Sequence, residues 1–174
     1  MKLGNISVRE DDTGRSIAFF CKDPSVGVTK ELIDAMISWS KRHNSCDLRV
    51  CLHQSIEDRF HQMIILLHGG IYRRPHKEIR QESCHIIQGK MMLFLFTSVG
   101  KVSRRIIVDN TNTIVYRIGA DQWHVSVPIT PIVIFHEAKT GPFAGHETKF
   151  APWAPTSQKD GLKYIQGLLE ERGT

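Results

Sequence analysis

The middle of the chain alternates between short apolar runs and turn signals. Between residues 48 and 138 the runs are LRVCLH, QMIILLH, SCHIIQ, MMLFLFT, RRIIVD, TIVYRI, WHVSVP and IVIFHEA. Turn sequences such as HGG, QGK, DNTN and GADQ separate several of them. Many short strands at regular spacing, with no helical pattern between them, are typical of a β-sandwich or β-barrel. We therefore predict a mainly β fold, a barrel or jelly roll.

Helical patterns flank this β region. Residues 29–43 place apolar side chains on one helical face, with Thr29 as a suitable N-cap and basic residues in the last turn. Near the C-terminus, Ser157 and Asp160 have the spacing of a capping box, with Asp in place of Glu. The chain then divides into an N-terminal segment with one helix packed on the barrel (1–47), the barrel (48–155) and a C-terminal helix (156–174). In the N-terminal segment SIAFF resembles one short strand, and the Pro- and Gly-rich tail of the barrel region is expected to be an ordered loop.

Composition narrows the classes of partner. The formal net charge of +5 favours anionic ligands but is too weak to indicate nucleic acid by itself. The basic residues form no continuous stripe with interleaved aromatic residues, so we expect no nucleic-acid partner.

Cysteine usage and hydropathy bear on the compartment. The 4 cysteines show no CxxC spacing and no disulfide framework, which indicates a reducing environment. The N-terminus lacks the apolar core of a signal peptide, and no apolar run approaches the ~20 residues of a membrane span. We expect a cytoplasmic protein without a membrane partner.

Polar residues interrupt the β region where a core is expected. His76, Glu78, Glu82 and His85 lie between two apolar runs, and buried charge is costly unless it is paired or binds a metal. His76 and Glu78 share strand parity, so both can face one interior point. His85 lies three residues after Glu82 and faces the opposite way on a regular strand, so we expect a structural or surface role for it.

The spacing of these residues resembles a known signature. Gly70 is followed by five residues, then His76, one residue, Glu78, three residues, Glu82, six residues and Gly89. This resembles the first motif of the cupin superfamily, whose members are small β-barrels or jelly rolls. Glu78 stands where a second His is usual in that motif. His124 matches the His of the second cupin motif, although Gly119 and Asp121 replace the usual Pro and Gly before it.

The resemblance implies one divalent metal ion, held by His76, Glu82 and His124. Glu78 is the candidate fourth ligand, and the alternative is that it faces solvent and balances Arg80. Mixed nitrogen and oxygen ligands suit iron, manganese, nickel or zinc.

Several longer segments are similar to the WbuC family of cupin-fold metalloproteins, from Arg49 to Pro155 and in the preceding helix. The segments are RVCLHQSIEDRFHQMIILLHGGIYRRPHKE, ESCHIIQGKMMLFLF, WHVSVP, FHEAKTGPF and FAPWAP. The resemblance implies a place among proteins of O-antigen or other surface-polysaccharide (lipopolysaccharide) biosynthesis. Related small cupins act on nucleotide-linked sugars as epimerases or ketoisomerases, and a homodimer is expected by the same analogy.

Other residues are candidates for substrate binding and proton transfer. Tyr72 and Arg74 share the parity of His76 and are candidates for contacting an anionic substrate, the alternative being solvated side chains at the barrel rim. His136 and Glu137 are candidates for a general acid or base beside the metal.

Three functions stay open at this point. The first is a metal-dependent isomerase or epimerase that acts on a carbohydrate or sugar nucleotide. The second is an Fe(II)-dependent oxygenase, for which two His and one Glu form a facial triad if Glu78 is not a ligand. The third is a non-catalytic metal-containing module that binds a sugar. Each takes a small-molecule partner.

Overall fold

The computed structural model describes residues 1–11, 16–144 and 147–171. In these ranges the elements, in chain order, are β1 (Lys2–Leu3), β2 (Ile6–Asp11), β3 (Ile17–Cys21), α1 (Lys30–Arg42), β4 (Leu48–Cys51), β5 (Phe60–His68), β6 (His76–Glu78), β7 (Glu82–Gln88), β8 (Met91–Phe96), β9 (Val102–Val108), β10 (Val115–Ile118), β11 (Trp123–Pro128), β12 (Ile132–Thr140), β13 (Thr148–Phe150) and α2 (Gln158–Glu170).

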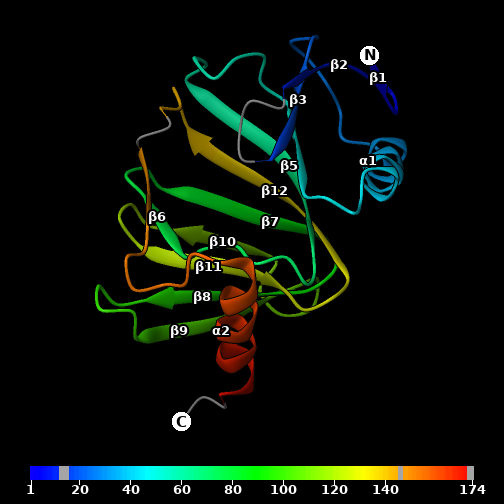
Figure 1. Ribbon diagram of the computed structural model, residues 1–174. Coiled ribbons are helices and arrows are strands. Elements are labelled where there is room, and N and C mark those ends of the chain that lie inside the picture. Colours follow the sequence, from blue (N-terminus) through cyan, green and yellow to red (C-terminus); the bar gives the residue numbers. More distant parts are fainter. Residues whose placement is uncertain (12–15, 145–146, 172–174) are drawn as a thin grey trace.

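These strands form two sheets (Figure 1). The larger has the order β1-β2-β3-β4-β5-β12-β7-β10, and the smaller has the order β13-β6-β11-β8-β9. Strands β3 and β4 pair in parallel, whereas the pairs β5–β12, β7–β12 and β8–β11 are antiparallel. The prediction of a mainly β jelly roll with an N-terminal and a C-terminal helix is confirmed.

Strand alternation divides the apolar residues between the inside of the jelly roll and the two helices. On β5, Ile64 and Leu66 pack in the core that also contains Leu32 and Met36 of α1. The alternate residues of β5 face the other sheet and line the interior. On β8, Leu93 lies in the interior cluster and Phe94 packs with Ile165 of α2. Each helix therefore covers the outer face of one sheet.

The caps of both helices agree with the sequence. Thr29 Oγ1 accepts a hydrogen bond from the backbone N–H of Leu32 at 3.2 Å. Ser157 Oγ accepts one from the backbone N–H of Asp160 at 3.1 Å and donates to the carboxylate of Asp160 at 2.7 Å. Neither element reaches the length and hydropathy of a membrane-crossing helix, as judged over the described ranges.

The edges of the sheets differ from the sequence prediction. The described part of the N-terminal segment contributes three strands to the larger sheet in addition to α1, where the sequence indicated one. The tail expected to be loop contains β13, which pairs with β6. Strand β12 continues to Thr140, two residues beyond the predicted run. Pairing with a neighbouring strand fixes such short or terminal segments, and sequence periodicity carries little signal for them.

Candidate metal centre and adjoining cavity

Two histidines and one carboxylate meet between the sheets. His76 of β6 and His124 of β11 are directly in register, and their ring centroids are 4.6 Å apart. Glu82 comes from β7 of the facing sheet, and its Oε1 lies 3.0 Å from Nε2 of His124. His124 and Glu82 are both buried. Residues 42 positions apart in the chain are thus brought together because the two sheets face each other.

The backbone orients both imidazole rings. Nδ1 of His76 lies 3.2 Å from the carbonyl oxygen of Arg74, and Nδ1 of His124 lies 2.8 Å from that of Gln122. An N–H at Nδ1 donates to each carbonyl and directs Nε2 away from it, toward the cluster. Histidines that bind a metal through one nitrogen are commonly held in this way through the other.

The protonation states follow from burial and pairing. Burial lowers the pKa of His76 to about 4, so this ring is neutral. Burial also disfavours a charge on His124, but its hydrogen bond to Glu82 outweighs that effect and raises its pKa. Burial alone would raise the pKa of Glu82, and the contact with His124 lowers it to about 2. His124 and Glu82 therefore form an imidazolium–carboxylate pair.

His76, Glu82 and His124 are residue types that bind divalent ions, but the contact of His124 with Glu82 is that of a protonated imidazole with a carboxylate. Over the described residues, no set of three or more His, Cys, Asp or Glu side chains is arranged to hold a metal. His124 Nε2 and Glu82 Oε1 are instead in direct contact at 3.0 Å. A ligating His must be deprotonated, so metal binding would replace the proton that these two share. Two neutral imidazoles and a carboxylate then suit iron, manganese, nickel or zinc.

Glu78 is turned toward Lys139. Its Oε2 lies 2.9 Å from Lys139 Nζ, and its Oε1 accepts a hydrogen bond from the Thr148 hydroxyl at 3.2 Å. Lys139 Nζ also lies 3.6 Å from Oε1 of Glu137. Burial lowers the pKa of Lys139, but the surrounding carboxylates outweigh it and raise the pKa, so the ammonium is retained. Arg80, the alternative partner of Glu78, instead pairs with Glu147 at 3.0 Å.

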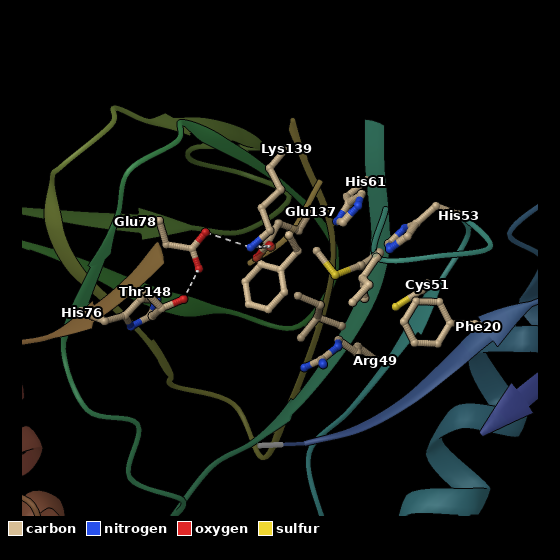
Figure 2. A pocket seen from close by; sticks show the side chains of 14 residues that line it. Phe20, Arg49, Cys51, His53, His61, His76, Glu78, Glu137, Lys139 and Thr148 are labelled. Carbon is tan, nitrogen blue, oxygen red and sulfur yellow. Dashed lines mark hydrogen bonds and ion pairs between the residues drawn. The ribbon is translucent and has the colours of Figure 1, made fainter. Parts of the chain in front are cut away.

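Two cavities meet at this cluster. The inner cavity, about 160 Å³, is lined by His76, Glu82 and His124 among others. The outer cavity, about 380 Å³, is shown in Figure 2, with Lys139 and Glu78 on one side and Arg49, Cys51 and Phe20 on the other. The side chains of Ile65, His76, Glu78 and Glu137 line both cavities. A ligand in the outer cavity would therefore touch the wall of the candidate metal centre.

The two proton-transfer candidates occupy opposite faces of β12. Glu137 lines both cavities, and burial and the nearby charge of Glu82 raise its pKa to about 7. His136 is in register with His85, which is exposed. Burial and the charge of His85 lower the pKa of His136. The structure brings Glu137 to the site and places His136 on the other face, and His85 faces outward as expected.

Tyr72 and Arg74 are not brought to either cavity. The Tyr72 hydroxyl donates to the carbonyl of Pro155 at 2.8 Å, and the Arg74 guanidinium donates to that of Ala151 at 2.6 and 3.1 Å. Residues 71–75 form no strand, so parity with His76 does not determine their direction. Arg73 lines the inner cavity, and its Nε donates to Asp47 Oδ2 at 2.8 Å.

Sequence reasoning missed Lys139 and Arg49. Lys139 has the same parity as Glu137, and recognising that β12 extends to Thr140 would have found it. Arg49 has the same parity as the inward Cys51, on a strand that the sequence did predict. His53 and His61 also line the outer cavity, and no spacing pattern distinguished them.

One family model matches part of the chain. It covers residues 28–108 and is described as "Domain of unknown function (DUF6016)". That range includes His76, Glu78 and Glu82 and ends before His124 and β12. No curated protein matches the chain.

Solved structures are similar in fold at low identity. Protein SO0799 from Shewanella oneidensis is 11% identical with a TM-score of 0.52, over 70% of this chain and 82% of that one. CapF, solved with the inhibitor 3-isopropenyl-tropolone, is 14% identical with a TM-score of 0.50, over 60% of this chain and 31% of CapF. An RmlC-like cupin family protein with a double-stranded β-helix fold, from Methanocaldococcus jannaschii, is 17% identical with a TM-score of 0.42, over 53% of this chain and 79% of that one.

These likenesses concern the fold alone. The chain spans about a third of the length of CapF, so whatever CapF does as a whole is not carried over. With its two facing sheets, the chain has a jelly-roll fold, and its function has to be argued from the cluster and the two cavities.

Proposed function

We propose that this chain is a divalent-metal-dependent cupin that moves a proton on a carbohydrate or sugar nucleotide, as an isomerase or epimerase. One observation carries the proposal: His76, Glu82 and His124 meet beside a cavity of about 380 Å³, and Glu137 lies at the boundary. The cavity has the size of a small-molecule site.

The residues divide into holding and proton-transfer roles. His76, Glu82 and His124 would hold the ion, which supplies a positive charge that polarises a carbonyl or binds adjacent hydroxyls. Glu137 would take a proton from the substrate carbon and return it, because a pKa of about 7 allows both protonation states near neutral pH. Lys139 holds Glu78 at 2.9 Å and so orients it away from the three ligands.

The biological setting is part of the proposal. The segments similar to the WbuC family support a role in surface-polysaccharide biosynthesis, and the mildly basic charge is compatible with an anionic sugar. A homodimer in the cytoplasm is proposed on the same resemblance.

A proton-exchange experiment tests this function. The metal-loaded protein is incubated in D₂O with a panel of keto-sugar nucleotides, and deuterium at carbon is measured by mass spectrometry. We expect exchange that Glu137→Gln abolishes with the metal retained, whereas the matched variant His136→Gln keeps both. Equal exchange in wild type and Glu137→Gln would contradict the role of Glu137, and the absence of exchange across the panel would contradict the isomerase assignment.

One observation favours a second candidate, an Fe(II)-dependent oxygenase. Because Glu78 is engaged by Lys139 and Thr148, the remaining set is two His and one Glu, the facial-triad composition. Oxygen consumption that requires Fe(II), and is lost in His124→Ala, would support this candidate over the isomerase.

A further inference from the structure

Arg49 occupies an unusual position on the inward face of the larger sheet. On β4, Leu48 and Val50 are buried in the core beneath α1, so Arg49 and Cys51 point to the opposite face. Arg49 is in register with Ala18 of β3 and Ile65 of β5, and its side chain lines the outer cavity. A guanidinium on an inward sheet face is costly unless a partner or water meets its charge.

The hydrogen bonds of Arg49 use only part of the donor capacity of its guanidinium. Among the described residues, its Nη1 donates to the hydroxyl of Ser16 at 2.7 Å, and its side chain also hydrogen-bonds the side chain of Cys51. Both are neutral acceptors. A guanidinium carries five N–H donors in a flat fork, and one hydroxyl and one thiol accept only some of them. Among the described residues, Asp11 is in register with Arg49 through Ala18 and lies two strands away from it.

Lys139, which also lines the outer cavity, has charged partners. Lys139 is matched by Glu78 at 2.9 Å and by Glu137 at 3.6 Å. Between Lys139 and Arg49 the wall contains the apolar side chains of Met63 and Ile65. In Figure 2 the two cations lie on different sides of the cavity. The cavity thus has a neutralised polar end at the metal centre, an apolar wall, and a cation at the far end.

We propose that Arg49 binds an oxyanion, a carboxylate or phosphate, of the small molecule that enters the outer cavity. The flat fork of donors matches such groups in a bidentate manner. With this group anchored, the rest of the ligand lies along the apolar wall and reaches His76 and Glu137 at the boundary. The inference adds a substrate class to the proposed function and rests on that function only for the reaction at the other end, because anion binding by Arg49 needs no metal.

Calorimetric titration with inorganic phosphate and, separately, succinate tests the proposal on the full chain after treatment with EDTA. Removing metal excludes anion binding by a bound ion. We expect wild type to bind at least one anion in the millimolar range, and the anion that binds distinguishes phosphate from carboxylate recognition. Arg49→Met should weaken binding at least about 10-fold. Arg49→Lys, which keeps the charge without the fork, should fall between them.

Arg104→Met is the matched control, because Arg104 is an exposed arginine on β9. It should bind like wild type. Binding by Arg49→Met and Arg49→Lys at wild-type strength would overturn the proposal, as would the absence of binding to wild type up to about 50 mM of either anion. The proposed function fails separately: if metal content is nil while Arg49-dependent anion binding persists, the metal assignment alone is contradicted.

Discussion

The inner and outer cavities share one wall but differ in how their charged side chains are paired. The charged side chains that line the inner cavity have charged partners: His124 pairs with Glu82, Arg73 pairs with Asp47, and Glu78, which lines both cavities, pairs with Lys139. The outer cavity extends from that wall past apolar side chains and the stacked rings of His53 and His61 to Arg49. Paired charges hold a fixed geometry, which suits a metal centre, whereas a cation with a neutral acceptor suits recognition of a ligand.

Removing Lys139 should have the largest effect on stability, because it disrupts the ion pairs beside the cluster. Its Nζ neutralises two carboxylates, and its side chain is only 11% exposed. In Lys139→Met, Glu78 loses its charged partner, and the pKa of Glu137 rises further so that this carboxyl takes up a proton. We therefore expect a loss of about 3 kcal/mol in the free energy of unfolding. Urea denaturation of the metal-free protein measures it.

A matched lysine provides the control for this prediction. Lys77 pairs with Asp121 at 2.8 Å, but the side chain of Asp121 is 62% exposed. Lys77→Met should therefore cost at most about 0.5 kcal/mol. Similar losses in the two variants would show that the inner ion pairs are no stronger than a surface pair. Adding Glu78→Gln to Lys139→Met should recover part of the stability.

Only part of the site could be predicted from the sequence. The spacing of His76, Glu82 and His124, which resembles the cupin motifs, predicted residues that the fold indeed gathers. The direction of Tyr72 and Arg74 was not predictable in this way, since they lie in a segment without strand geometry that binds the tail. The pairing of Glu78 with Lys139 depends on contact between two strands 61 residues apart, which one sequence does not reveal.

The histidines of the outer cavity should make stability depend on pH. Burial and the neighbouring His61 lower the pKa of His53 to about 4, from an ordinary value of 6.5, and His53 is 8% exposed. Below pH 6.5, His53 takes up a proton in the unfolded chain but not in the folded chain. The free energy of unfolding therefore falls as the pH drops toward 4. We expect a contribution of about 2 kcal/mol lost between pH 8 and pH 5.

The variant His53→Gln checks this assignment, because it removes the titrating group. Urea unfolding at pH 8 and pH 5 should show a smaller difference in His53→Gln than in wild type. The matched variant His85→Gln changes an exposed histidine and should leave the difference unaltered. Equal pH dependence in wild type and His53→Gln would exclude His53 as its source.

Thr148 should have the smallest effect, and it sharpens the account of Glu78. Its hydroxyl donates to Glu78 Oε1 at 3.2 Å from β13. Thr148→Val keeps the side-chain shape and removes that donor, so we expect a loss of about 1 kcal/mol. In a Glu78→Gln background the loss should shrink, and an unchanged loss would show that Thr148 stabilises the protein by another contact.

The central claim is that the cluster between the sheets binds a divalent metal. The most direct test is elemental analysis of purified wild type, His76→Ala and His124→Ala, with His85→Ala as the control on an exposed histidine. We predict near-stoichiometric metal in wild type and His85→Ala, and its loss from the other two variants. Metal retained in His124→Ala, or none in wild type after reconstitution with Fe(II), Mn(II), Ni(II) and Zn(II), would contradict the claim.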